Sequence, residues 1–251
     1  MKSFTSVLLI WLAIASPIWG AARTSITSGP WSTGSTWVGG VAPGDGDTGV
    51  VNHTVTVTSN QVMGIDSAGV SLSGNGHLVI ADGVHLTVKG WLAADFAFTI
   101  GENSKYIFFS DTGARFFRTT GQITVNGTLA NPSIFESTTP GANNGYFSRS
   151  VANHNRITGG WLKLENVGTN TNPNRFADPS LAGVIQTNCG QFQINDVAAT
   201  DPFSIQNFTS ITPTASVTID FLVNGLTAPT GGATRFLDRI RLAQSGIIDG
   251  N

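Results

Sequence analysis

Few residues of this chain have the types and spacing that cleavage of a polysaccharide requires. The nearest candidates lie in one short segment, residues 101–118, and are Glu102, Asp111, Arg115 and Arg118. Hydrolysis of a glycosidic bond uses two carboxyl groups about 5–10 Å apart, and elimination uses calcium-binding acids beside a base that abstracts a proton. Asp111 and Arg115 flank a predicted turn and could face one side of neighbouring coils. An ordinary exposed ion pair explains them more simply, so we favour a protein without catalytic activity.

Aromatic side chains that could stack on sugar rings occur at Trp91, Tyr146 and Trp161. Trp and Tyr combine a large apolar ring with a polar tip, which suits a partly wet binding surface. Trp161 begins a predicted strand, where a core position explains it equally well. These three residues are the candidates for glycan binding.

Asp45 and Asp47 form an Asp-x-Asp pair on a glycine-rich turn. Carboxylates that alternate with backbone carbonyls can bind calcium, which takes six to eight oxygen ligands. The spacing of the known calcium loops is absent, so we favour aspartates that cap a tight turn and expect no cofactor.

The histidines and the single cysteine suggest no reactive centre. His77 and His85 each precede a predicted inward leucine and should therefore point outward into solvent, whereas His53 shares the alternation of the core valines. We expect His53 to close the first core layer with a hydrogen bond to a turn. Cys189 has no partner for an intrachain disulfide, and a small buried side chain is the preferred interpretation.

Short strands separated by tight turns must position all of these residues. Apolar and polar residues alternate in seven segments, each bounded by Gly, Asn or Asp, and no helical periodicity is convincing. The segments are 53–59, 69–74, 76–83, 84–90, 96–102, 105–111 and 121–129. The pattern predicts an all-β fold.

The spacing of the strands narrows this fold to a right-handed parallel β-helix, a solenoid of stacked coils. The segment 161–167 is echoed at 191–197, and further strands are predicted at 216–220 and 238–242. Irregular periods of about 20–30 residues are typical of solenoids whose corners tolerate insertions. We expect two long aperiodic loops, 136–160 and 168–179. Asn126, Asn166 and Asn224 could form stacked amide ladders or serve as ordinary turn residues.

The segment 30–47 places Trp31 and Trp37 among glycines close to the start of the chain. The first coil of a solenoid exposes an apolar cross-section and unpaired strand groups that must be covered. Two indoles can bury a large apolar area, and glycines allow the backbone to turn tightly around them. We therefore expect an N-terminal glycine- and tryptophan-rich cap.

The same segment resembles the opening of the eight-glycine ("G-eight") extracellular domain. The resemblance covers about residues 29–130 and is carried by Trp31, Trp37, Gly39-Gly40, Pro43-Gly44, Gly46-Asp47, the strand 50–57 and the units 74–90 and 98–108. Gly49 departs from the family pattern because it interrupts a run that is usually β-branched. The remaining residues resemble pectate-lyase-like right-handed β-helix coils only generically.

The resemblance implies an exported or cell-surface protein in a glycan-facing environment, because some relatives bind or break down extracellular glycans such as hyaluronan. No catalytic motif of the family can be matched residue by residue. On this basis residues 23–135 would be an eight-glycine-like domain that forms the first coils. Residues 136–251 would be further coils.

The first 22 residues are typical of a secretory signal peptide. An apolar run at residues 7–15 is followed by Pro17 and by small residues at Gly20-Ala21-Ala22, with cleavage expected after Ala22 or, second, after Gly20. The run is shorter than the about 20 residues that span a bilayer, so no membrane span is expected. The net charge of −2 and the 11% content of charged residues argue against a nucleic-acid partner.

Together these features predict a secreted or cell-surface β-helix module that binds extracellular glycans, or builds a scaffold, without catalysis. One alternative is a polysaccharide lyase or glycoside hydrolase of the β-helix type, and a second is an adhesin or surface-passenger segment. The strand pattern stops abruptly before Asn251. We therefore expect the chain to be a fragment of a longer protein with further domains.

Overall fold

The computed structural model describes residues 20–66, 69–109, 113–138, 145–148, 155–168, 174–187, 192–194 and 211–213. In these ranges the fold is nearly all β, with nineteen short strands and two short 3₁₀ turns, η1 (Gly34–Thr36) and η2 (Val38–Gly40). Every pairing between the strands is parallel. The same ranges contain no helix that is long and apolar enough to cross a membrane. The prediction of an all-β chain with parallel strands is confirmed.

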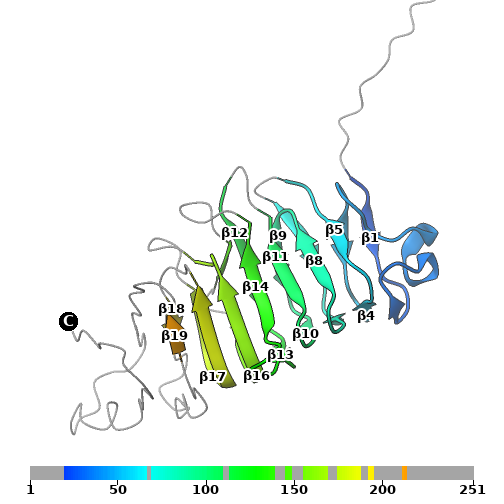
Figure 1. The fold of residues 1–251 in the computed structure, drawn as a ribbon. Coiled ribbons are helices and arrows are strands. Elements are labelled where there is room, and N and C mark those ends of the chain that lie inside the picture. Colours follow the sequence, from blue (N-terminus) through cyan, green and yellow to red (C-terminus); the bar gives the residue numbers. More distant parts are fainter. Residues whose placement is uncertain are drawn as a thin grey trace, which may run out of the picture.

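The strands stack in three columns, which we call A, B and C. Column A is a six-stranded sheet: β1 (Ala22–Thr24), β3 (Thr48–Val50), β6 (Val70–Ser73), β9 (Trp91–Ala94), β12 (Arg115–Thr119) and β15 (Gly145–Phe147). Each of its strands is followed along the chain by a strand of another column. The chain therefore returns to column A one rung further on, and Figure 1 shows the rungs side by side along one axis.

Columns B and C are the two arms of one 13-stranded sheet. Column B contains β2 (Gly29–Pro30), β4 (Thr54–Val57), β7 (His77–Ile80), β10 (Ala97–Ile100) and β13 (Gln122–Val125). Column C contains β5 (Gln61–Met63), β8 (His85–Val88), β11 (Lys105–Phe108) and β14 (Ser133–Ser137). The long strand β16 (Arg156–Glu165) joins both arms, because its first half pairs with β13 and its second half with β14.

The last described strands continue the same stack. They are β17 (Asn174–Thr187), which pairs with β16, and the short strands β18 (Phe192–Ile194) and β19 (Ile211–Pro213), which pair with β17. A parallel sheet that curls through three columns in successive rungs is consistent with a parallel β-solenoid.

The core follows from the alternation of the strands, because every second residue points inward. Register places inward residues of successive rungs directly on one another, as in the column-A series Leu72, Leu92, Phe117 and Phe147. Seven buried rings cluster in the later rungs with centroid distances of 4.5–6.4 Å: Phe98, Tyr106, Phe108, Phe117, Phe135, Phe147 and Phe176. Burial raises the pKa of the Tyr106 hydroxyl above its usual value.

Trp31 and Trp37 are completely buried at the N-terminal end of the stack. Their rings meet edge to face with a centroid distance of 4.9 Å. Trp31 Nε1 donates to Pro43 O at 3.0 Å, and Trp37 Nε1 donates to Trp31 O at 2.7 Å. A Cβ atom on Gly49 would lie 3.0 Å from Leu72 Cδ1 and 3.6 Å from Trp31 Cη2. The glycine that interrupts the expected β-branched run therefore leaves room for the core around Trp31.

Of the two interpretations of the asparagines, the described positions favour turn residues over stacked ladders. Asn126 is exposed, Asn166 is a turn residue with a φ of 54°, and Asn224 lies outside the described ranges. The buried amides that connect rungs are those of Asn155 and Asn174, which accept hydrogen bonds from Thr119 N (3.1 Å) and Phe147 N (3.2 Å). Asn155 directly precedes β16 and Asn174 is the first residue of β17, so each amide can satisfy a neighbouring rung's backbone at the corner.

The prediction of two continuous long loops is wrong, because both segments contain strands. The segment 136–160 contains β15 and the start of β16, and the segment 168–179 contains the start of β17. A strand of three residues such as Gly145–Phe147 is too short to show alternation. Cys189, His154 and the predicted strands 216–220 and 238–242 fall outside the described residues.

The histidines lie on or near the surface as two of the three predictions state. His77 is half-buried on column B, where its Nε2 lies 2.8 Å from Thr99 Oγ1, and burial lowers the pKa of its imidazole. His85 is half-buried on column C. The prediction that His53 closes the first core layer is wrong, because its side chain is half-buried; its Nδ1 lies 3.0 Å from Ser25 O.

Candidate ligand-binding hollow beside column A

An open hollow of about 460 Å³ lies where the strands of column A turn into column B. It is lined by Asn52, Ser73, Gly74, Asn75, Ala93, Ala94, Asp95 and Arg118. These residues come from four successive rungs, so the hollow extends along the solenoid axis. Its volume falls within the range of about 300–1,000 Å³ that is typical of small-molecule sites.

Small residues form part of this lining because the backbones of adjacent rungs approach closely there. Gly74 has a φ of 121°, which disfavours any side chain. A Cβ atom at Gly74 would lie 2.2 Å from Val51 O. Ala93 and Ala94 in the next rung are likewise short. The polar side chains around them can therefore reach a ligand that lies against the backbone.

Arg118 is the cation of the hollow. Its guanidinium lies 5.3 Å from the centroid of the Phe116 ring. Its Nε is buried and makes no hydrogen bond with any described residue. Within the described ranges no carboxylate forms an ion pair with Arg118. The charge of this guanidinium is thus not paired with a carboxylate of the described residues.

Asp95 is the anion of the hollow and is exposed. Its Oδ1 accepts a hydrogen bond from Thr120 Oγ1 at 2.9 Å, which orients the carboxylate and leaves Oδ2 without a described partner. Asn52 and Asn75 are also exposed, and their side-chain amides make no hydrogen bond to the described part of the chain. The hollow therefore combines donors and acceptors that the protein itself does not use.

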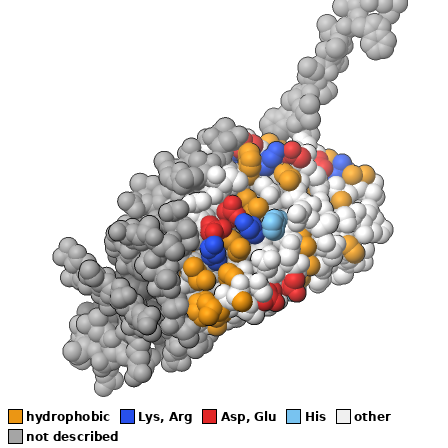
Figure 2. Space-filling model, viewed as in Figure 1, with side chains coloured by type: hydrophobic (Ala, Val, Ile, Leu, Met, Phe, Trp, Pro, Cys, Tyr) orange, Lys and Arg blue, Asp and Glu red, His pale blue; other side chains and the backbone are white. Residues whose placement is uncertain are grey.

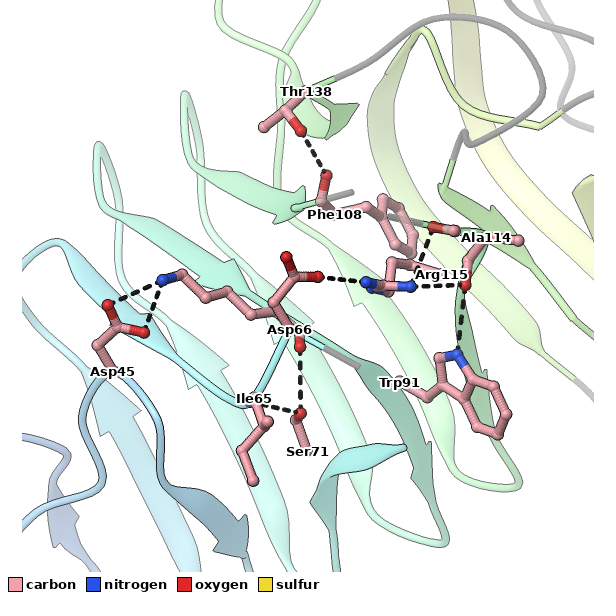
Figure 3. A network of polar contacts seen from close by, with 11 residues as sticks. Asp45, Ile65, Asp66, Ser71, Trp91, Phe108, Ala114, Arg115 and Thr138 are labelled. Carbon is pink, nitrogen blue, oxygen red and sulfur yellow. Dashed lines mark hydrogen bonds and ion pairs between the residues drawn. The ribbon is translucent and has the colours of Figure 1, made fainter. Parts of the chain in front are cut away.

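A row of three aromatic rings, Trp91, Phe116 and Tyr146, runs beside the hollow on the outer face of column A. We call it the aromatic ladder. The ring centroids are 4.6 Å apart for Trp91 and Phe116 and 6.2 Å apart for Phe116 and Tyr146. All three rings are half-buried, and Trp91 Nε1 donates to Ala114 O at 3.3 Å (Figure 3). Arg118 lines the hollow and also contacts the ladder, so the two features form one surface.

Burial raises the pKa of Tyr146, although the positive charges of Arg175 and Arg118 oppose the shift. These two guanidinium groups therefore lie near the phenol at the end of the ladder. The structure thus brings together two of the three sequence candidates for glycan binding, Trp91 and Tyr146. It places the third, Trp161, elsewhere: its ring packs on Gly183 of the next rung, where a Cβ atom would lie 2.4 Å from Trp161 Cζ3.

Glu102 and Arg115, two of the sequence candidates for catalysis that the structure describes, lie apart. Glu102 lies at a corner between columns B and C, where Oε1 accepts hydrogen bonds from Thr128 Oγ1 (2.8 Å) and Asn131 Nδ2 (3.1 Å). Arg115 is 1% exposed; it donates to Gly113 O and Ala114 O and forms an ion pair with Asp66 (Figure 3). Asp111 lies outside the described residues. Glu102 and Arg115 thus anchor turns at different corners.

The carboxylates of Asp45 and Asp47 are both engaged in local contacts. Asp47 accepts hydrogen bonds from Ala21 N (2.7 Å) and Gly44 N (3.1 Å). Asp45 forms an ion pair with Lys89 at 2.7 Å (Figure 3). This geometry matches the interpretation of aspartates that hold a tight turn. In the described ranges no three His, Cys, Asp or Glu side chains are grouped so that they could hold a metal ion.

Column C carries a charged cluster that the sequence analysis missed. Figure 2 shows acidic and basic side chains gathered on this face, and the residues are Lys105, Glu136, Lys163 and Glu165. Glu136 and Glu165 are paired in register on the adjacent strands β14 and β16, an arrangement that brings two carboxylates side by side. Each is bound by a lysine, Glu136 by Lys105 at 2.6 Å and Glu165 by Lys163 at 2.5 Å. The cluster is therefore a ladder of partly exposed ion pairs, which contribute little to stability.

Comparison of the chain with protein-family models, with curated proteins and with solved structures found no match. The fold and the hollow are therefore the basis for inferring function, and the resemblance to the eight-glycine domain stays a prediction.

Proposed function

We propose that this protein is a secreted or cell-surface module that binds extracellular glycans without cleaving them, through the hollow and the aromatic ladder of column A. The observation that carries the proposal is a set of polar side chains with unused hydrogen-bonding capacity beside three half-buried rings. A sugar residue has hydroxyl groups at its edge and apolar C–H groups on its faces. A surface with adjacent polar and aromatic rows complements both parts.

The proposed scaffold is a right-handed parallel β-helix with an N-terminal cap. Connections between parallel strands of one sheet are right-handed in about 98% of cases, which supports this hand. Trp31 and Trp37 are buried at the end of the stack from which the rungs begin. A solenoid end needs such a cover, so we assign the cap to these two indoles and the turns around them.

The proposal that the protein does not cleave glycans is supported by carboxylates that are bound to other groups of the protein. Glu102 accepts two hydrogen bonds from a turn, and Glu136 and Glu165 are each bound by a lysine. A general acid or base must be able to approach the substrate. Export is supported by the apolar leader in residues 1–22 and by the resemblance to the eight-glycine domain.

The experiment is a retention assay with immobilised polysaccharides, combined with an assay for released reducing and unsaturated ends. We expect retention without release. Arg118→Ala and Trp91→Ala should each lower retention at least about fivefold. The first variant removes a polar group of the hollow, and the second removes a ring of the aromatic ladder. Lys163→Ala is the control, since it removes a positive charge from column C and should leave retention unchanged.

The outcomes separate the candidate functions. Released product would replace the proposal with a polysaccharide-degrading enzyme, and loss of product in Asp111→Ala or Glu136→Gln would identify its acid. No retention on any polysaccharide would replace it with a scaffold or adhesin. Equal retention of the wild type and Arg118→Ala would show that the glycan binds at a surface other than the hollow.

A further inference from the structure

We infer that the hollow selects an uncharged sugar residue, whose two adjacent hydroxyl groups lie between Asp95 and Arg118. The inference rests on the proposed function and specifies its ligand. It follows from the charges that line the hollow and from the hydrogen bonds that those groups can still make.

The charges of the lining are balanced. The hollow has one carboxylate, Asp95, and one guanidinium, Arg118, and its other polar groups are uncharged. A uronate or sulfate attracted to Arg118 would enter the same space as the Asp95 carboxylate. Like charges in a partly desolvated site repel, and such repulsion is a common source of specificity. The hollow thus disfavours an anionic sugar although it contains an arginine.

The available donors and acceptors favour hydroxyl groups. An ionised Asp only accepts hydrogen bonds and an Arg only donates them, whereas a hydroxyl group does both. Thr120 already donates to Asp95 Oδ1 at 2.9 Å, which leaves Oδ2 without a described partner. One hydroxyl can donate to Oδ2 while its neighbour accepts from the Arg118 guanidinium. Asn52 and Asn75, which offer both kinds of group, can bind the remaining hydroxyls.

No carboxylate in the described part of the chain forms an ion pair with Arg118, which lines the hollow. Arg175 lies beside Tyr146 at the ladder and is absent from the lining of the hollow. The contrast with column C is clear, because there each Glu is bound by a lysine of the protein.

The test compares neutral and acidic polysaccharides as ligands of the whole chain at fixed ionic strength. The neutral probes are mannan, galactan and xylan, and the acidic probes are polygalacturonate, alginate and hyaluronan. We expect the best neutral probe to be retained at least about tenfold more tightly than any acidic probe. Periodate, which cleaves adjacent hydroxyl pairs, should abolish retention of the neutral probe.

Asp95→Asn changes the charge of the hollow while keeping the size and the acceptor for Thr120. We expect this variant to gain about tenfold in affinity for the acidic probes. Asp45→Asn is the matched control, because it removes an exposed carboxylate at another corner and should change neither affinity.

Two results would overturn the inference. A wild-type preference for acidic probes that Asp95→Asn leaves unchanged would refute the neutral-sugar assignment while leaving glycan binding intact. Retention of the neutral probe after periodate treatment would refute the role of adjacent hydroxyl groups. Failure of every probe to bind would reject the proposed function and the inference with it.

Discussion

Replacing Trp31 by phenylalanine tests whether the N-terminal tryptophans belong to the core of the solenoid. The indole of Trp31 is completely buried and donates from Nε1 to Pro43 O. Phenylalanine keeps a six-membered ring but leaves this carbonyl without a donor, which costs about 1–3 kcal/mol. The atoms removed from a closely packed site add a cavity term of about 1 kcal/mol. We expect Trp31→Phe to lower the free energy of unfolding by about 2–4 kcal/mol.

Urea unfolding followed by far-ultraviolet circular dichroism measures this loss. Trp91→Phe is the control, because its indole is half-buried and its hydrogen bond to Ala114 O is long at 3.3 Å. The control should lose about 1 kcal/mol or less. Equal losses in the two variants would refute the argument that Trp31 is a core residue.

Gly49 provides a second, independent check of the same packing. A Cβ atom there would crowd Leu72 Cδ1 at 3.0 Å and approach Trp31 Cη2 at 3.6 Å. Gly49→Val should therefore destabilise the wild type by about 1–3 kcal/mol. The smaller ring of Trp31→Phe relieves part of this crowding, so the two changes should be non-additive by at least about 0.5 kcal/mol. Strict additivity would mean that the two side chains do not share space.

Three further predictions concern polar groups with different degrees of burial. Arg115→Met breaks the ion pair with Asp66 and should lower the free energy of unfolding in urea by about 2–4 kcal/mol. The loss should be somewhat smaller than for a fully buried pair, because Asp66 is partly exposed. An unchanged free energy of unfolding would show that the pair is dispensable. Burial lowers the pKa of His77 in the folded state. The unfolded chain therefore binds more protons than the folded chain as the pH falls through the ordinary histidine pKa of 6.5, and stability decreases with falling pH. His77→Gln should flatten this decrease, and an unchanged pH profile would contradict the prediction. A protein that begins at Ala21 should be about 1–3 kcal/mol more stable than one that begins at Arg23. The terminal ammonium of Ala21 would donate to the Asp47 carboxylate, which lies 2.7 Å from Ala21 N. Equal melting temperatures of the two proteins would contradict this contribution.

The strands and the buried tryptophans could be predicted from sequence because both depend on local pattern. Alternation in a segment such as residues 76–83 identifies a strand without knowledge of its neighbours. Trp31 and Trp37 among glycines likewise indicate tight turns around large apolar groups. The short strand Gly145–Phe147 was missed because three residues show no period. Asn155 was missed because its partners, Thr119 and Arg175, belong to other rungs.

The candidate site could not be predicted because its residues meet only through register. Asn52, Asn75, Asp95 and Arg118 come from four rungs, and the chain between them varies in length from one rung to the next. The corner loops determine which residues become neighbours, and sequence patterns do not fix their lengths. Trp91 and Tyr146 were chosen for their chemistry, whereas Phe116, the ring between them, gave no signal without the register.

The corners between columns A and B explain how separate rungs can form one binding surface. A Cβ atom on Gly76 would lie 2.4 Å from the backbone of His53, and one on Gly121 would lie 2.2 Å from Phe96 O. These corners stack without intervening side chains, so the residues beside them keep a fixed register along the axis. At the corners between columns C and A, the Asp45–Lys89 and Asp66–Arg115 pairs connect successive rungs. Tight corners thus create a continuous edge on which polar groups of successive rungs align. An extended ligand that follows this edge would contact several rungs at once, so each rung would need to supply only a few weak contacts.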